Sequence, residues 1–225
     1  LGNAIGSIIC NTGLVLGLVA FISPFKVDKK MFFSKSTLLI ISVVTMILLG
    51  LDGNITRKDG MILLVMLGIY MYTNYKSVID DNNKSNKVMR NKKDNAFAEG
   101  LKIGIFFIIG LVMMIVGSKL LVDNGVKIAQ ILGIPQGVIS LTVIALGTSL
   151  PELVSAITAI KKKHNAISVG NVLGANILNI VSVIGISAIP NNIPILSQAM
   201  KVDFPFMILL LLTLILPTIK KNRLY

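Results

Sequence analysis

Long apolar stretches alternate with polar connections from one end of the chain to the other. A helix needs about 20 apolar residues to cross the ~30 Å hydrocarbon core of a membrane. The chain offers seven candidates, of which the third is short. They lie at 1–23, 36–51, 60–75, 101–122, 136–160, 166–189 and 203–219. This pattern predicts an all-α membrane protein with about seven spans.

Composition and charge placement support a membrane location. Hydrophobic residues make up 54% of the chain and charged residues only 14%, which excludes an ordinary soluble domain. The net charge of +12 would suit nucleic acid, but 17 of the 22 Lys and Arg residues fall in four alternate connections, as the positive-inside rule requires of cytoplasmic loops. These connections are 24–35, 76–102, 161–165 and 220–225. We therefore expect a multi-pass protein of the cell membrane without a nucleic-acid partner. Residue 1 lies outside, and the loop 76–100 and residue 225 are cytoplasmic.

The polar stretch 76–100 is the one long connection and divides the chain into two membrane units. It has almost no apolar content, which is typical of a flexible linker. We expect three spans before it, in 1–75, and four after it, in 101–225. Cys10 lies within the first span and has no partner for a disulfide in this chain. His164, the only histidine, stands in a basic turn, where it is expected to be solvated.

The two units contain the same motif at an offset of 168 residues. The segment that starts at Gly2 matches the one that starts at Gly170 at eight of the first twenty positions. The matches include Gly2/Gly170, Asn3/Asn171, Gly6/Gly174, Asn11/Asn179 and Gly17/Gly185. Because the first of these spans runs inward and the second outward, the repeats are inverted. Inverted repeats are the architecture of many secondary transporters, which bind their substrate near the membrane midplane.

By this symmetry, parts of both repeats are expected to lie outside the chain. The segment 101–168 has no counterpart ahead of residue 1, and the span 60–75 has no counterpart before residue 225. We expect an intact protein of about 310 residues with ten spans, five in each repeat. The units 1–75 and 101–225 are then the remainders of the two repeats, without the first two spans and the last one.

Residues 147–152, Gly-Thr-Ser-Leu-Pro-Glu, place a carboxylate inside an apolar span, whereas the other nine Asp and Glu residues lie in or next to polar connections. A charge at that depth costs about 2.5–3.5 kcal/mol even on lenient insertion scales, so Glu152 is expected to face a cavity and bind a cation. Pro151 has no N–H and leaves the carbonyl four residues back without its helical partner. With the hydroxyls of Thr148 and Ser149, these groups form an all-oxygen ligand set, which suits Ca²⁺ and Na⁺. The alternative is a proline kink whose glutamate faces a polar bundle interior for structural reasons.

The Gly-Asn motifs offer two further oxygen ligands. Asn11 and Asn179 lie on opposed helices, and each brings a neutral amide carbonyl that can ligate a cation without adding charge. Ser7 is one turn before Asn11, so both can point into one site. Intramembrane Asn residues can also serve only as interhelical hydrogen bonds. The glycines four residues apart in each motif are expected to let helices approach closely.

At this point two motifs together resemble a known family. Residues 145–152, Ala-Leu-Gly-Thr-Ser-Leu-Pro-Glu, followed by 170–179, Gly-Asn-x-x-Gly-x-Asn-x-x-Asn, are similar to the second α-repeat of the calcium/cation antiporter superfamily. Residues 2–11 look like the tail of the first α-repeat, and the greatest likeness is to prokaryotic sodium/calcium exchangers. The resemblance implies four helices around a central group of cation sites, where one Ca²⁺ competes with about three Na⁺ under alternating access.

The resemblance also implies a role for each site residue. Glu152 would bridge the Ca²⁺ site and a Na⁺ site. The other implied ligands come from the same helix or from the two Gly-Asn helices. They are Thr148 and the carbonyl of Ala145 on one side, Ser149 and Ser7 at the flanking sites, and Asn11 and Asn179 at the two Gly-Asn positions.

Three positions depart from the family pattern. Ala175 stands where a Ser is usual, so one side-chain oxygen is lost and a flanking Na⁺ site is expected to be weaker. Asn179 stands where many relatives carry Asp, which removes a titratable carboxylate and with it proton coupling through that position. Ile8 replaces an Asn and is expected to cost a structural hydrogen bond.

The leading interpretation is a Na⁺-driven Ca²⁺ antiporter, not an enzyme, with no cofactor besides the transported ions. A Ca²⁺/H⁺ or K⁺-dependent exchanger of the same fold stays open, as does the oligomeric state. A cation channel should lack the inverted symmetry and should conduct without a counter-ion. An intramembrane hydrolase needs a nucleophile and a base, yet the only histidine is in a loop and no predicted span holds two carboxylates.

Overall fold

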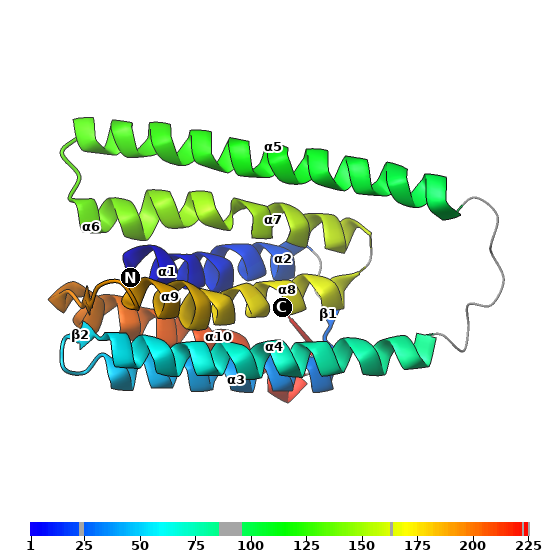
Figure 1. The fold of residues 1–225 in the computed structure, drawn as a ribbon, viewed down its shortest axis with the longest axis horizontal. Helices are drawn as coiled ribbons and strands as arrows, with labels where there is room; N and C mark the ends of the chain where they lie inside the picture. The colour runs from blue at the N-terminus through cyan, green and yellow to red at the C-terminus, as the bar shows by residue number, and fades with distance from the viewer. Residues whose placement is uncertain (23–24, 86–95, 163, 222, 225) are drawn as a thin grey trace.

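A computed structural model describes residues 1–225 except 23–24, 86–95, 163, 222 and 225. Each predicted span corresponds to a long helical segment (Figure 1). The segments are α1, η1 and α2 (Gly2–Ile9, Cys10–Val15, Leu16–Ile22), α3 (Lys29–Leu49), α4 (Arg57–Ser85), α5 (Ala96–Ile131), α6, η2 and α7 (Gln136–Ile139, Ser140–Ile144, Ala145–Lys161), α8, η3 and α9 (Asn165–Leu178, Asn179–Ile184, Gly185–Ala188), and η4 and α10 (Ala199–Asp203, Phe204–Lys221). The η labels mark π-helical turns. Four short strands lie between or after these segments: β1 (Phe25–Lys26), β2 (Asn54–Ile55), β3 (Ile193–Pro194) and β4 (Arg223–Leu224).

Among the described residues, six of these segments are long and apolar enough to cross a membrane. The segment outside this set is α4, whose apolar part, 60–75, is short, as the sequence predicted. The chain is therefore an all-α membrane protein. Most helices extend beyond the apolar stretches because polar residues at helix ends reach past the hydrocarbon core.

Several helix boundaries differ from the sequence prediction. Helix α3, the second helical segment, begins at Lys29 instead of residue 36. The Asp28 side chain caps it by accepting a hydrogen bond from the Met31 backbone N–H at 2.8 Å. Helix α4 continues to Ser85 and α5 begins at Ala96, so helical structure covers both ends of the predicted linker 76–100. The middle of that linker, 86–95, lies outside the described residues.

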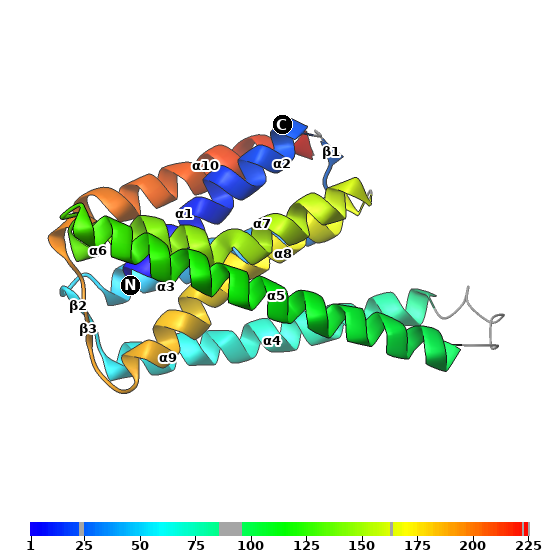
Figure 2. The ribbon, with the colours of Figure 1, turned by 90° about the horizontal axis from the view of Figure 1, so that it is seen from above.

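The two Gly-Asn motifs lie on neighbouring helices that run in opposite directions. We call Gly2–Ile22 the first motif helix and Asn165–Ala188 the second motif helix. Figures 1 and 2 show them side by side with opposed chain directions, and α1 contacts both α8 and η3. Each also contains a π-helical turn at the repeated Asn, in η1 and in η3. This antiparallel relation agrees with the predicted inverted repeat.

The short strands follow the same symmetry. Adding 168 to the numbers of β1 gives those of β3, and adding 169 to those of β2 gives those of β4. In the structure β1 pairs with β4, and β2 pairs with β3, both antiparallel. The two pairs are therefore equivalent contacts between the repeats, one at each end of the bundle (Figure 1).

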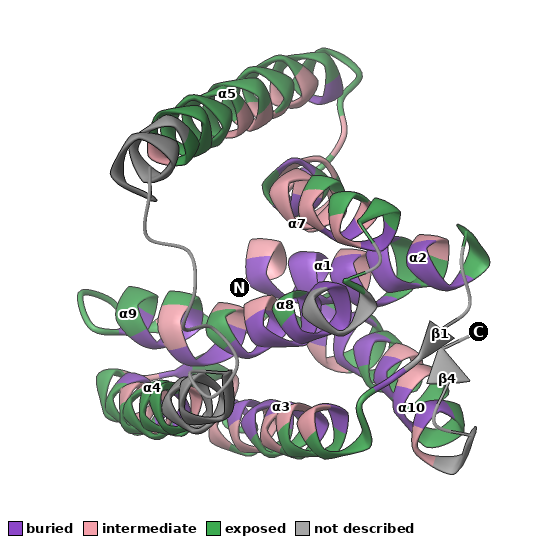
Figure 3. Ribbon diagram, turned by 90° about the vertical axis from the view of Figure 1, so that its right-hand side faces the viewer, coloured by how far each residue is buried: buried purple, intermediate pink, exposed green. Residues whose placement is uncertain are grey.

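Burial is greatest on the two motif helices. In their most apolar windows of 18 residues, 56% and 61% of the residues are buried, whereas none is buried in the corresponding window of α5. Figure 3 shows the second motif helix in the middle of the bundle and α5 apart from most of it, against α7. The repeated motifs thus form the centre of the molecule, and α5 presents apolar side chains outward, as a lipid-facing helix does.

Glycines let the central helices approach closely, as predicted. A Cβ on Gly6 would lie 2.6 Å from the Cβ of Ala145 and would also meet the backbone of Leu141. A Cβ on Gly174 would lie 2.7 Å from the hydroxyl of Tyr70. Only a residue without a side chain fits at Gly6, because its neighbours there include backbone. At Gly174 the neighbour is the end of the Tyr70 side chain, which can shift to admit a methyl group.

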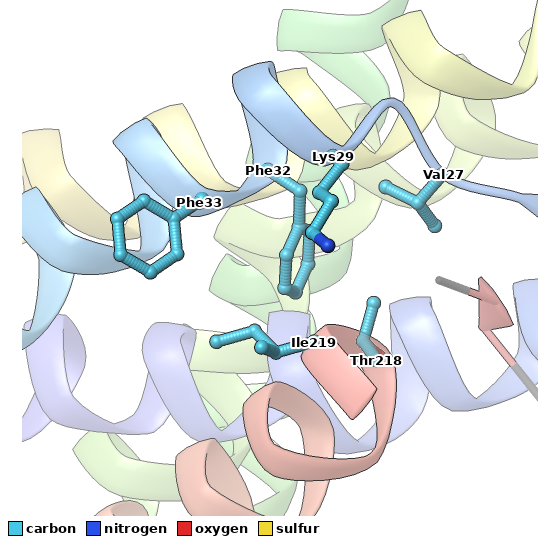
Figure 4. A pocket seen from close by; sticks show the side chains of 6 residues that line it. All are labelled: Val27, Lys29, Phe32, Phe33, Thr218 and Ile219. Atoms are coloured by element: carbon cyan, nitrogen blue, oxygen red, sulfur yellow. The ribbon is translucent and has the colours of Figure 1, made fainter. Parts of the chain in front are cut away.

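The described parts of the four basic connections lie toward one end of the bundle, at the right of Figure 1. This agrees with the predicted alternation of sides. A small apolar pocket of about 20 Å³ lies at this end between the start of α3 and the end of α10 (Figure 4). Val27, Lys29, Phe32, Phe33, Thr218 and Ile219 line it. Such a volume holds about one water at most, so the pocket is a packing seam between the two helices.

Candidate cation site

Glu152 lies in the middle of α7, directly after Pro151, and its side chain is half-buried. Its Oε2 atom is buried and has no hydrogen-bond partner. Leaving a carboxylate oxygen desolvated and unpartnered is costly, unless a cation supplies the missing interaction. A cation bound at this oxygen would offset that cost, so the position of Glu152 is compatible with the predicted role as a ligand.

Two more buried oxygens without a partner come from the same region. They are Oγ of Ser149, on α7, and Oδ1 of Asn11, on η1. Ser149 is 2% exposed and Asn11 is 1% exposed, and α7 contacts η1. Buried polar atoms are hydrogen-bonded in the great majority of cases, and oxygens of this kind can ligate a cation. In the described part of the chain, the two other such oxygens belong to Ser36 and Ser168, on α3 and α8.

A chain of hydroxyl contacts joins the first motif helix to α7. Oγ of Ser7 lies 3.0 Å from Oγ1 of Thr148. The Thr148 hydroxyl is also 3.2 Å from Oδ1 of Asn3 and 3.1 Å from the carbonyl oxygen of Ala145. Four oxygen atoms that could ligate a cation thus meet where α1 and α7 touch. Three of them, on Ser7, Thr148 and Ala145, were predicted as ligands, and the fourth belongs to Asn3.

A second polar contact joins the two motif helices directly. The Asn11 side chain donates from Nδ2 to Oδ1 of Asn176 at 3.0 Å, and Asn176 donates from its own Nδ2 to Oγ1 of Thr12 at 3.0 Å. All three side chains are buried. This amide chain uses the nitrogen of Asn11 and leaves its oxygen free.

Asn179 differs from its repeat partner Asn11. It begins η3, is only half-buried, and makes no side-chain hydrogen bond to any other described residue. Asn179 thus lies on η3, the element of the second motif helix that contacts α1. The structure joins three of the seven predicted ligands, Ser7, Thr148 and the Ala145 carbonyl, by contacts of 3.0 and 3.1 Å. It places Ser149 and Glu152 on α7, which contacts the first motif helix, and it places Asn11 and Asn179 on the two motif helices.

The chemistry of these groups is that of hard cations. Hydroxyl, amide and carboxylate oxygens with a single formal charge suit Ca²⁺ and Na⁺. No group of three or more His, Cys, Asp or Glu residues able to hold a metal occurs in the described residues. The arrangement therefore lacks the ligand cluster of a zinc or iron centre there.

Comparison with known proteins identifies the family. The sodium/calcium exchanger protein family matches residues 1–76 and 102–222, which is most of the chain. The chain belongs to this family. Its resemblance to the calcium/cation antiporter superfamily is thereby confirmed.

Relatives of this exchanger-family chain include archaeal membrane proteins. It is 38% identical over 195 residues to the uncharacterised membrane protein MJ0091 of Methanocaldococcus jannaschii, covering 86% of this chain and 61% of the relative. It is 26% identical over 254 residues to the sodium/calcium exchanger MaX1 of Methanosarcina acetivorans, covering 96% and 71%. The chain spans about three-fifths of the length of MJ0091 and of the inner membrane protein YrbG of Escherichia coli, 61% and 59% respectively.

Solved structures of the sodium–calcium exchanger NCX_Mj share the fold. One of them, soaked with 2.5 mM Na⁺ and 1 mM Sr²⁺, gives a TM-score of 0.71 at 34% identity and covers 99% of this chain and 69% of that one. Another, soaked with 10 mM Na⁺ and zero Ca²⁺, gives 0.70 at 32% identity. The exchanger-family chain thus has the fold of a membrane transporter, and the prediction that it is not an enzyme is supported.

The candidate site lies beside two buried polar residues that the sequence analysis did not select as ligands, Asn176 and Thr12. Asn176 could have been selected from the sequence, because an amide in an apolar helix is costly unless it bonds to a partner on another helix. The offset of 168 pairs Asn176 with Ile8, and so it gave no symmetric candidate.

One acidic residue also lies deeper than predicted. The last helical segment begins at Ala199, so Asp203 lies inside it and is 8% exposed. Glu152 is therefore not the only carboxylate within a long helix. Asp203 lines a cavity of about 420 Å³ at the end of the bundle where residue 1 lies. Its other lining residues include Gly2, Ser140 and Gln198.

Proposed function

We propose that the transporter carrying this sequence exchanges Ca²⁺ for Na⁺ by alternating access. The observation that supports this most directly is that the contacting elements α7 and η1, one from each inverted repeat, carry buried oxygens without hydrogen-bond partners, on Glu152, Ser149 and Asn11. Such a site at a repeat interface is typical of secondary transporters. Membership of the sodium/calcium exchanger family favours these two ions over other hard cations.

The proposed ligands divide by element. Glu152, Thr148, Ser149 and the Ala145 carbonyl belong to α7, Ser7 and Asn11 to the first motif helix, and Asn179 to the second. Glu152 supplies the one formal charge among them. Neutral oxygens from the other residues replace the water of the ion without adding charge.

Coupling between the two ions follows from the cost of an empty site. Without a cation, Glu152 is a charge in a desolvated region, and a closed intermediate that excludes water raises its cost further. The conversion between outward-open and inward-open states is therefore fast only when Ca²⁺ or Na⁺ neutralises this charge. Because both ions use the same oxygens, each must leave before the other binds, and the two flows become coupled.

The coupling ion can be tested by separating the gradients. Vesicles containing the purified transporter would be loaded with Na⁺, K⁺ or acidic buffer, and uptake of ⁴⁵Ca²⁺ would be followed. We expect an outward Na⁺ gradient to drive uptake, with K⁺ or pH gradients alone ineffective. Uptake driven by pH without Na⁺ would identify a Ca²⁺/H⁺ exchanger instead, and a requirement for K⁺ would identify a K⁺-dependent one. Uptake that follows the Ca²⁺ gradient alone, with no counter-ion, would indicate a channel.

The proposed location is the cell membrane, with residue 1 outside and the basic end of the bundle in the cytoplasm. The distribution of Lys and Arg supports this orientation. Labelling of single cysteines from one side of sealed cells, at position 51 near β2 and at position 162 after α7, tests it. We expect only the first to react from outside in a variant in which Cys10 is replaced by Ala.

A further inference from the structure

We propose that Asn176 is a positioning residue that turns the amide of Asn11 so that its oxygen faces the cation. This inference rests on the proposed function, because it assigns a partner to one of the proposed ligands. The two polar atoms of the Asn11 side chain have different surroundings. Nδ2 of Asn11 is bound to Asn176, whereas Oδ1 of Asn11 is buried and has no partner.

An asparagine amide has two ends of opposite character. Its oxygen attracts a cation, and its NH₂ group repels one. The two orientations fill the same volume, so packing alone does not choose between them. A hydrogen-bond partner that accepts from the NH₂ end makes the choice. Oδ1 of Asn176, 3.0 Å away, is such an acceptor.

Asn176 is itself held in place. Its Nδ2 donates to Oγ1 of Thr12, also at 3.0 Å, and Asn176 is 0% exposed. With Nδ2 directed to Thr12, the oxygen of Asn176 points to Asn11. The Thr12 hydroxyl can accept or donate, and the hydrogen bonds Asn11–Asn176–Thr12 present the Asn11 oxygen to the site in the direction in which Thr12 accepts. A cation in the site and this direction of the chain stabilise each other, as partners behind a metal ligand do.

The repeat shows that this device exists on one side only. The offset of 168 carries the pair Asn11–Asn176 onto Asn179–Ile8. Ile8 is fully buried but has no polar atom, so it cannot orient an amide. Asn179 accordingly has no side-chain hydrogen bond within the described residues. The two proposed amide ligands thus have the same chemistry, but only Asn11 has a hydrogen-bond partner that orients its amide among the described residues.

A double-mutant cycle tests the positioning role. Asn176→Leu should raise the Ca²⁺ concentration for half-maximal Na⁺-driven uptake about tenfold, the lower end of the effect of losing a partner behind a metal ligand. In an Asn11→Asp background the same change should have an effect within about twofold, because a carboxylate presents an oxygen in either orientation. Thr12→Val should give an intermediate effect of about threefold, the size expected for one neutral hydrogen bond.

The controls separate positioning from folding. Ser168→Ala removes another fully buried polar group from α8, and we expect unchanged Ca²⁺ dependence. The unfolding temperature of each variant is measured alongside transport. If Asn176→Leu weakened Ca²⁺ use equally in both backgrounds, or left it unchanged in the parent, the positioning role would be wrong. If the parent itself showed no Na⁺-driven Ca²⁺ uptake, the proposed function would fail instead.

Discussion

The two motif helices have the same backbone design and different side-chain chemistry. Both carry Gly-Asn-x-x-Gly, both contain a π-helical turn at the repeated Asn, and both are buried at the centre. On the first, Asn11 is 1% exposed and bonded to the opposite helix, whereas on the second Asn179 is half-buried and unbonded among the described residues. Symmetry of the fold therefore does not carry over to the ligands, and the two sides of the site should respond differently to the same substitution.

The largest expected effect tests whether there is a cation site between these helices and α7. Glu152→Gln removes the charge that binds the cation but keeps the shape, and it also relieves the cost of burial. We expect Na⁺-driven Ca²⁺ uptake to be abolished while the unfolding temperature stays the same or rises. Ser155→Ala, one turn along α7, is the matched control, because the Ser155 hydroxyl donates to the backbone carbonyl of Glu152 and makes no hydrogen bond to its carboxylate in the described structure. Normal Ca²⁺ uptake by the Glu152 variant would exclude the site.

The next effect separates the two asparagines. Asn11→Leu should lower stability by about 1–3 kcal/mol, because it leaves the buried oxygen of Asn176 without its donor. Asn179→Leu breaks no bond seen in the described structure and should leave stability nearly unchanged. Both should impair Ca²⁺ uptake, since each removes a proposed ligand. Equal losses of stability, measured by thermal unfolding in detergent, would contradict the comparison.

A third pair of changes concerns the glycines. Gly6→Ala forces the first motif helix against Leu141 and Ala145 and should destabilise the protein by about 1–3 kcal/mol. Gly17→Ala, on the same helix, meets no atom within 4 Å and should be neutral or stabilising by up to about 1 kcal/mol. Its repeat partner Gly185 lies between these cases, since a Cβ there would be 3.3 Å from the Cβ of Leu63. Unfolding temperatures in another order would show that the close contact at Gly6 is not specific.

The smallest expected effect is a change in pH dependence. Asn179→Asp adds a proton-accepting group beside the site, so protons then compete with Ca²⁺ and Na⁺ there. Exchange by this variant should fall more steeply on acidification than exchange by the parent. The measurement is Na⁺-driven Ca²⁺ uptake from alkaline to acidic pH. Identical profiles for parent, Asp and Leu forms would reduce Asn179 to interhelical packing.

Much of the fold could be predicted because hydrophobicity and charge act over long stretches. The seven helical segments, their alternation and the inverted repeat all follow from the order of apolar and basic residues. The π-helical turns could not be predicted, because one extra residue in a helical turn changes hydrogen-bond register without changing hydrophobicity. The ends of α3 and α5 also differ from the prediction, since capping and polar helix formers extend a helix beyond the membrane core.

The candidate site was predictable in part for a related reason. A carboxylate in an apolar span is costly wherever the chain folds, so Glu152 is visible in the sequence alone. The partner of Asn11 is not, because it depends on how two helices turn toward each other. Repeat symmetry pointed to Asn179, and the structure shows Asn176.

The strand pairs at the two ends of the bundle determine where motion can be observed. The β1–β4 pair ties the end of the first motif helix to the end of α10. Two spectroscopic probes placed there, at exposed Phe21 and Leu216, should keep a constant separation through the transport cycle. Probes at exposed Phe106 on α5 and Tyr72 on α4 have no strand pair between them. The distance between Phe106 and Tyr72 is therefore expected to report the opening and closing of this transporter better than the distance between Phe21 and Leu216.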